Sequence, residues 1–331
     1  TSGTTGNPKG VLLSHGNIIE AVHVNTASIS EYMECIDLSN ETHIAYLPLA
    51  HIYEFVVEMK QKLKTEFGVV EDGRLQKLLG VRYRWENIED ADNAKVILSM
   101  NDKAAEIIRS YEKATGLTPR LQKTPGKPGE ILIKNEGKAE RHEEYRSVLG
   151  KLMFYVTKIS PECSYACGQL ARQMHNPSAS HWEAMGRIVG YLKAKKTHEL
   201  VIMRPKTLKI VSFGDASYAD CRDTRRSSTG DLHTIGGSLI SWRAQKTKFV
   251  CLSSAEAEYV ALTEMCKEQK FLTMLLEEIH TCELPSWLYE DNEAAAYLAR
   301  NQHVLSRTKH IDIREHYVRE HIQKLGKIVP I

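Results

Sequence analysis

The chain has 331 residues, of which 42% are hydrophobic and 26% are charged, so it is long enough for about two globular domains and is neither disordered nor fibrous. Seven cysteines, an odd number spread over a long chain, exclude a small disulfide scaffold, and no apolar run approaches the roughly 20 residues of a membrane-spanning helix. No charged-then-apolar leader opens the chain, and we expect an intracellular protein that is a fragment or a fusion.

Charge divides the chain into two unlike parts. The first 58 residues hold one cation, Lys9, and seven acids, whereas the remaining residues hold 43 cations and 35 acids. An acidic head on a basic body predicts two parts of different origin, and the basic part is compatible with a polyanionic partner such as nucleic acid. A solvated surface would give the same balance, so charge alone does not decide between these interpretations.

The head opens with a glycine- and hydroxyl-rich stretch, Thr1–Gly10. Glycines allow tight turns, and the exposed N–H groups and hydroxyls of such a loop can bind phosphate oxygens. Together with Val11–His15 and Tyr46–Glu54, this stretch resembles the adenylate-forming enzymes, in particular the long-chain acyl-CoA synthetases. Because the resemblance stops near Glu58, we expect a truncated fragment over residues 1–58, which binds ATP only if it is functional. The resemblance places these residues in the remnant of an ATP-phosphate loop: Thr1, Ser2, Gly3, Thr4, Thr5, Gly6 and Lys9.

A change in pattern begins at about Met59. Residues 67–85 alternate as strands around a turn at Asp72–Gly73, and Asn101–Thr115 has the apolar spacing of a helix. Three further helices are predicted over residues 141–158, 164–175 and 180–195, the last beginning with a capping box between Ser180 and Glu183.

Motifs in this middle region resemble the end of a copia-type retrotransposon reverse transcriptase and the connection that follows it. The motifs include Leu78–Val81, Tyr145–Gly150 and His181–Trp182. The resemblance implies a reverse transcriptase remnant over residues 59–140 and a helical connection over residues 141–205. Polymerases of that family hold Mg²⁺ with two neighbouring aspartates, and the sequence contains no Asp-Asp dipeptide, so we expect no polymerase activity.

The tail alternates strands and helices. An apolar strand over Leu208–Asp215 ends in an acid, and two further strands meet at a turn formed by Gly236–Gly237. A long helix over residues 254–279 precedes a strand at Trp287–Asp291. Two more helices, over residues 293–300 and 310–324, and a final strand from Lys327 complete an α/β fold with a mixed five-stranded sheet and flanking helices.

Two glutamates of the long helix compete as site residues. The apolar stripe through Leu262 and Met265 steps back onto Glu258, so this carboxylate points at the sheet, where burial without a cation is costly. Glu256 lies about 200° round the helix and three residues after Ser253, which is the spacing of a capping box. We therefore choose Glu258 as the candidate ligand.

Asp215 and Asp291 each end an apolar strand and would meet Glu258 at one edge of the sheet. Close carboxylates repel one another, and Mg²⁺ or Mn²⁺, hard cations with oxygen ligands, relieve that repulsion. Two such metals about 4 Å apart activate a water and stabilise the leaving oxygen of a phosphodiester. Each acid alone is explained equally well as a strand-end cap or an exposed turn residue. The three together predict a metal site that is also the catalytic centre.

The same residues lie in motifs that resemble the ribonuclease H domain of copia-type retrotransposons. The resemblance implies a ribonuclease H-like domain over residues 206–331 that cleaves the RNA strand of an RNA–DNA hybrid. Such folds generally carry a fourth carboxylate on a helix after the fifth strand, where this chain ends, so we expect impaired activity, with Asp312 and His310 as auxiliary candidates. The motifs are Phe213–Tyr218, Arg225–Gly230, Leu252–Tyr259, Asp291–Asn292 and Arg307–Asp312.

The expected partner is an RNA–DNA hybrid or another nucleic acid, and the sequence does not predict an oligomeric state. Two alternatives stay open at this point. One is a remnant of a long-chain fatty acid-CoA ligase that binds ATP, and the other is an inactive fusion relic that binds nucleic acid. Backbone phosphates would be met by basic residues of the tail, namely Arg222, Arg225, Arg226, Arg243 and Lys246.

Overall fold

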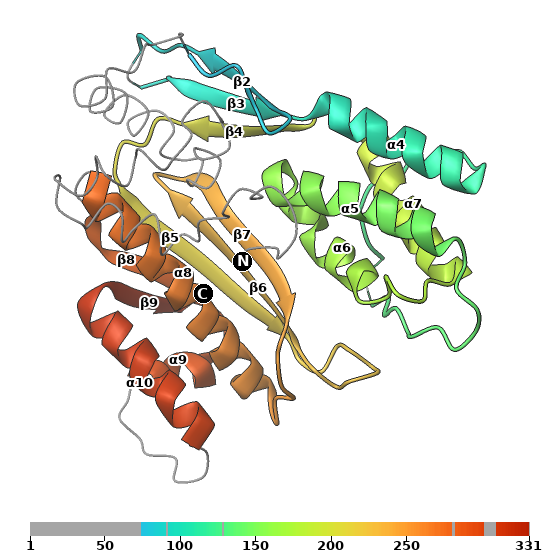
Figure 1. Cartoon of the computed structure of the whole chain (residues 1–331). Helices are drawn as coiled ribbons and strands as arrows, with labels where there is room; N and C mark the ends of the chain where they lie inside the picture. Colours follow the sequence, from blue (N-terminus) through green and yellow to red (C-terminus); the bar gives the residue numbers. More distant parts are fainter. Residues whose placement is uncertain (1–73, 91, 128, 280–281, 301–308, 331) are drawn as a thin grey trace, which may run out of the picture. The chain divides into compact units, whose positions relative to one another are not determined.

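The computed structural model describes residues 74–90, 92–127, 129–279, 282–300 and 309–330 (Figure 1). All of these residues belong to the unit that runs from Pro48 to Ile331. Among the helices of these ranges, none combines the length and the apolar character needed to cross a bilayer. The turn expected at Asp72–Gly73 lies outside the described residues, as do the phosphate-loop residues Thr1, Ser2, Gly3, Thr4, Thr5, Gly6 and Lys9.

The first sheet has four antiparallel strands in the order β1-β2-β3-β4. Strands β1 (Lys77–Leu78) and β2 (Val81–Glu86) are joined by Leu79–Gly80, whose φ angles of 47° and 77° belong to the two-residue turn favoured in hairpins. Strand β3 (Lys95–Ser99) pairs with β2 and with β4 (Glu199–Met203). Neither β3 nor β4 was predicted, because a short apolar run has no periodicity that separates strand from helix.

Helices fill the chain between β3 and β4. Helix α4 (Asn101–Thr115) has the predicted bounds and buries Ala104, Ile107 and Tyr111. The second of the three later helices is shorter than predicted, because turns replace the helix after Ala171. These elements are α5 (His142–Ile159), the 3-10 helix η3 (Pro161–Cys163), α6 (Ser164–Ala171) and α7 (Ala179–Ala194).

The start of α7 corrects one local prediction. The capping box expected between Ser180 and Glu183 is wrong, because the N-cap is Ser178 and its partner is His181. The Nδ1 atom of His181 accepts the backbone N–H of Ser178 at 2.9 Å, and its Nε2 atom lies 2.9 Å from the carbonyl oxygen of Ile133. A histidine stands where glutamate or glutamine usually closes this motif, which is why the sequence pattern did not reveal it.

The tail forms a five-stranded sheet in the order β7-β6-β5-β8-β9. Strand β6 pairs antiparallel with β5 and β7, whereas β8 pairs parallel with β5 and β9, so the sheet is mixed. The predicted turn at Gly236–Gly237 is confirmed, with φ angles of 55° and 84° that favour glycine. The strands are β5 (Lys209–Ser217), β6 (Ser228–Ile235), β7 (Ser238–Lys246), β8 (Glu283–Glu290) and β9 (Gly326–Pro330).

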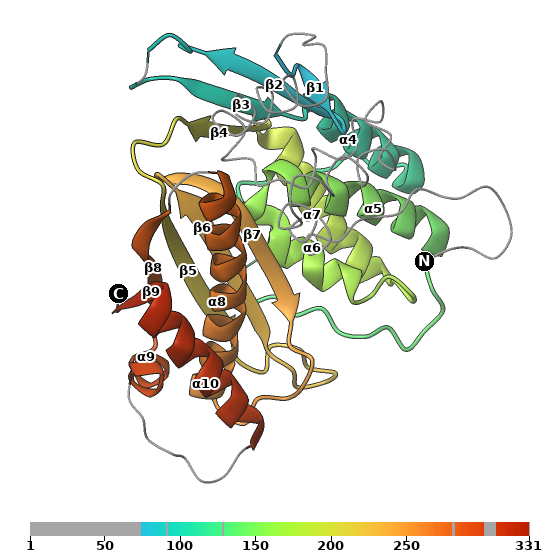
Figure 2. The same cartoon turned by 60° about the vertical axis from the view of Figure 1, so that its left-hand side comes forward.

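One long helix, α8 (Ser254–Ile279), covers a face of this sheet along β5 and β6 (Figures 1 and 2). Its stripe residues Leu262 and Met265 are fully buried, and each such side chain contributes about 1.5–3 kcal/mol to folding. Helices α9 (Glu293–Arg300) and α10 (Lys309–Lys324) pack against α8. The α/β fold class, with its mixed five-stranded sheet and flanking helices, is therefore confirmed.

Candidate metal centre

Three acidic side chains from separate elements meet at one end of the five-stranded sheet. Asp215 lies in β5, Glu258 in the first turns of α8, and Asp291 directly after β8. One carboxylate oxygen from each lies within 4.8 Å of the others. Asp215 does not end its strand as expected, because β5 continues to Ser217, which pairs with Ser228 of β6. The structure therefore brings together the three residues chosen from the sequence.

Close packing of α8 on β5 directs Glu258 toward the sheet. A Cβ added at Gly214 would lie 3.2 Å from a methionine sulfur of α8, so glycine lets the helix approach the strand. Glu256 has a different task. Its N–H donates to Ser253 Oγ at 3.1 Å, and its carboxylate accepts the N–H of Leu252 at 2.6 Å. Glu256 thus caps the helix, and Glu258 is the acid that faces inward.

The Glu258 carboxylate is buried in an environment that disfavours its charge. The residue is 8% exposed, and its Oε2 atom is buried without a hydrogen-bond partner. Burial, followed by the negative charges of Asp215 and Asp291, raises the pKa of Glu258 to about 7. A divalent cation would neutralise this repulsion and bind the unpartnered oxygen. Because all three side chains offer hard carboxylate oxygens, the donor set fits Mg²⁺ or Mn²⁺.

A fourth acid, Glu290, lies beside these three and was not predicted. It is the last residue of β8 and is fully buried. Its Oε1 atom accepts a hydrogen bond from the N–H of Asn292 at 3.2 Å, and its Oε2 atom has no hydrogen-bond partner. The pKa of Glu290 is raised to about 8, mainly by burial. The hydrogen bond from Asn292 lowers this pKa, and the negative charges of the three neighbouring acids raise it further. The alternation of β8, in which Ser286, Leu288 and Glu290 share the buried face, was the sequence signal for it.

The auxiliary candidates His310 and Asp312 both fall in helix α10. Their side chains lie outside the described residues, so a metal role for either of them stays a prediction.

One of the basic residues expected to meet phosphates has a partner inside the fold. The Nε and Nη2 atoms of Arg243 donate to Asp231 Oδ2 at 3.1 and 2.9 Å. The Asp231 side chain is 2% exposed, so Arg243 compensates a buried carboxylate. Arg222 and Arg225 are exposed in the β5–β6 loop, and Lys246 ends β7.

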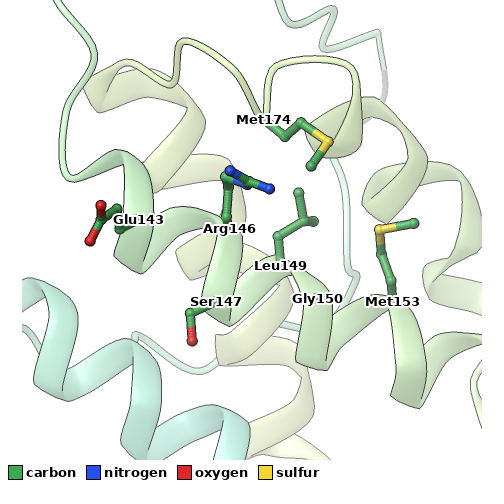
Figure 3. Close-up of a pocket in the computed structure, with 7 residues that line it drawn as sticks. All are labelled: Glu143, Arg146, Ser147, Leu149, Gly150, Met153 and Met174. Carbon is green, nitrogen blue, oxygen red and sulfur yellow. The ribbon is translucent and has the colours of Figure 1, made fainter. Parts of the chain in front are cut away.

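A separate hollow of about 500 Å³ lies along α5 (Figure 3). Arg146, Leu149 and Met174 lie close together there, whereas Glu143 points away from them (Figure 3). Glu143 is the single acid among the residues that line this hollow, so the hollow does not offer the clustered carboxylates of a metal site.

The N-terminal segment is similar to adenylate-forming enzymes. Residues 1–63 match the family model for the AMP-binding enzyme. Over 69 residues, the chain is 46% identical to the peroxisomal long chain acyl-CoA synthetase 6 of Arabidopsis thaliana, covering 21% of this chain and 9% of that protein. The boundary predicted at Glu58 falls inside the matched range.

The larger part of the chain is similar to retrotransposon polyproteins. Over 271 residues, it is 30% identical to the retrovirus-related Pol polyprotein from transposon TNT 1-94 of Nicotiana tabacum. Retrotransposon Pol polyproteins are relatives of this part of the chain, which we name the Pol region. This Pol region makes up 80% of the chain and about a fifth, 20%, of the tobacco polyprotein. Among solved structures, an N-terminal RNase H domain from Mycobacterium tuberculosis aligns with 38% of this chain and 84% of that chain, at 10% identity and a TM-score of 0.28.

Proposed function

We propose that residues 206–331 of the Pol region form a ribonuclease H-type nuclease that hydrolyses the RNA strand of an RNA–DNA hybrid by two-metal phosphodiester hydrolysis. The observation that carries the proposal is the convergence of Asp215, Glu258 and Asp291 within 4.8 Å, with one buried carboxylate oxygen left without a partner. The similarity to Pol polyproteins favours a nucleic acid over other substrates of metal-dependent hydrolysis.

In this proposal, Asp215, Glu258 and Asp291 would hold the divalent ions. When bound, the ions supply an activated water and stabilise the leaving oxygen. The contribution of the protein is to fix the backbone positions of the three ligands in advance, because β5, α8 and β8 pack against one another. Glu258 would hold an ion only in its deprotonated form, because metal ligands must be deprotonated.

Substrate binding would rest on basic residues at the same end of the sheet. Arg222 and Arg225 are exposed in the loop that joins β5, which holds Asp215, to β6. Contacts of this kind bind phosphates regardless of sequence, so we expect hybrid affinity to fall steeply with salt.

The test is cleavage of an end-labelled hybrid by the full chain in the presence of Mg²⁺. Asp215→Asn and Glu258→Gln should each lower the rate at least about a hundredfold, which corresponds to about 2.7 kcal/mol of lost transition-state stabilisation. Glu256→Gln is the matched control, because it removes the same charge from the same helix, and it should stay within about twofold. A hybrid that survives intact with both Mg²⁺ and Mn²⁺ would contradict the proposal.

Two other functions give different outcomes in the same set of assays. A fusion relic without catalysis would bind the hybrid in a salt-sensitive manner and leave it uncut. The match of residues 1–63 to the AMP-binding enzyme favours a ligase remnant as the second alternative. That function predicts release of pyrophosphate from ATP in the presence of a fatty acid.

A further inference from the structure

A cavity of about 270 Å³ lies between α6 and the paired ends of β6 and β7. Its lining offers two cations, Arg172 and Lys246, the hydroxyls of Tyr165 and Ser228, and the amide of Gln245. No acid is among the lining residues. We name this cavity the α6 pocket, and its lining has the chemistry of an anion site.

A buried carboxylate behind the α6 pocket holds its arginine in place. Asp220, whose side chain is 4% exposed, pairs with Arg172 at 3.5 Å and accepts hydrogen bonds from Ser228 Oγ at 2.6 Å and Tyr165 OH at 3.1 Å. Arg172 Nη2 also donates to Ser228 Oγ at 2.6 Å. Asp220 does not itself line the pocket. The carboxylate therefore fixes three of the polar side chains that do, and it offsets part of the positive charge of Arg172.

Lys246 adds a second positive charge to the α6 pocket. Within the described part of the chain, no acidic side chain forms an ion pair with Lys246. The positive field extends to Cys221. Burial alone would raise the pKa of this thiol, but hydrogen bonds from Thr224 and the charges of Lys246 and Arg172 lower it. A phosphate in the pocket would meet a field of the sign that stabilises it.

Strand register places the α6 pocket beside the three acids. Asp215 pairs with Gly230, and Gly230 pairs with Ala244, which lines the pocket. Directly opposed residues on neighbouring strands share a face, and a strand spacing of about 4.8 Å puts Ala244 about 10 Å from Asp215. Because one duplex turn spans about 34 Å, a single bound duplex reaches both places.

We propose that the α6 pocket binds one backbone phosphate of the nucleic acid whose scissile phosphate lies at Asp215, an inference that rests on the proposed nuclease function. The guanidinium of Arg172 supplies donors in a fixed plane, Lys246 supplies a point charge, and the amide of Gln245 adds a neutral donor. The pocket fixes the position of the duplex and does not read its sequence.

The experiment measures hybrid binding by the full chain in the Asp215→Asn background, without added divalent metal, over a series of salt concentrations. Lys246→Ala should make the negative slope of log affinity against log salt shallower by about 0.9, the value for one lost phosphate contact. It should lower the affinity for hybrids of different sequence by the same factor. Lys248→Ala is the matched control, because Lys248 is exposed nearby and does not line the pocket. Its slope should remain that of the background protein.

A second variant separates pocket occupancy from net charge. Ala171 lines the pocket, so Ala171→Leu partly fills it without changing any charge, and the slope should fall as it does in Lys246→Ala. Equal slopes for Lys246→Ala and Lys248→Ala would overturn the pocket proposal, and so would a background protein that does not bind the hybrid. Metal-dependent cleavage by the wild-type chain is measured separately. Cleavage with an unchanged Lys246→Ala slope refutes only the pocket, whereas a Lys246-dependent slope without cleavage refutes only the nuclease.

Discussion

Replacing Glu258 by glutamine should stabilise the metal-free protein at alkaline pH. Burial and the neighbouring acids raise the pKa of Glu258 from 4.5 to about 7, whereas the unfolded chain keeps the ordinary value. As pH rises, the unfolded state therefore loses this proton first, and the free energy of unfolding falls between about pH 4.5 and pH 7. The difference between the folded and unfolded pKa values of Glu258, at about 1.4 kcal/mol per unit, corresponds to a loss of about 3 kcal/mol in the free energy of unfolding. Glutamine keeps the shape of the side chain and has no proton to lose.

Urea denaturation of the full chain, followed by tryptophan fluorescence in the presence of a chelator, measures this effect. Glu258→Gln should resemble the wild type within about 1 kcal/mol at pH 5 and exceed its free energy of unfolding by about 2–3 kcal/mol at pH 8. Glu256→Gln, which loses a capping carboxylate, should show no such gain. At pH 8, Mg²⁺ at a hundred times its dissociation constant should stabilise the wild type by about 2.7 kcal/mol and Glu258→Gln by much less. A stability difference that does not grow between pH 5 and pH 8 would refute the reasoning.

Two further predictions concern packing and ion pairing elsewhere in the fold, and thermal denaturation tests both. Gly190→Ala should lower the free energy of unfolding by more than about 2 kcal/mol, because the new Cβ would collide with the carbonyl oxygen of Arg120. Gly150→Ala meets no atom within 4 Å and should raise the free energy of unfolding by about 0.5–1 kcal/mol. Equal effects of the two variants would contradict this prediction. Arg243→Met should cost about 3 kcal/mol, because the buried Asp231 carboxylate loses its arginine and keeps only His233 as a partner. Adding Asp231→Asn should recover most of the loss, and additive effects in the double variant would exclude the pairing.

Local signals in the sequence were sufficient for several elements and for the choice of one site residue. Helix α4 has the predicted bounds because its apolar spacing repeats over four turns, and the Gly236–Gly237 turn needs the positive φ angles that glycine permits. The choice of Glu258 over Glu256 followed from the same helical period together with the capping position after Ser253. Each of these features depends on residues within a few positions of one another, which is the range that a sequence pattern describes.

Only the tertiary structure decided the features that join distant segments. The β3–β4 ladder pairs Lys95 with Met203, on the order of 100 positions apart, and neither strand has a pattern of its own strong enough to predict it. Glu290 becomes a buried acid beside the other three only when α8 and the neighbouring strands enclose it. The α6 pocket exists only where Arg172 and Lys246 meet across two elements. Burial and electrostatic fields depend on everything that surrounds a side chain in space, so the sequence supplied the acids and cations, and packing determined which of them share a site.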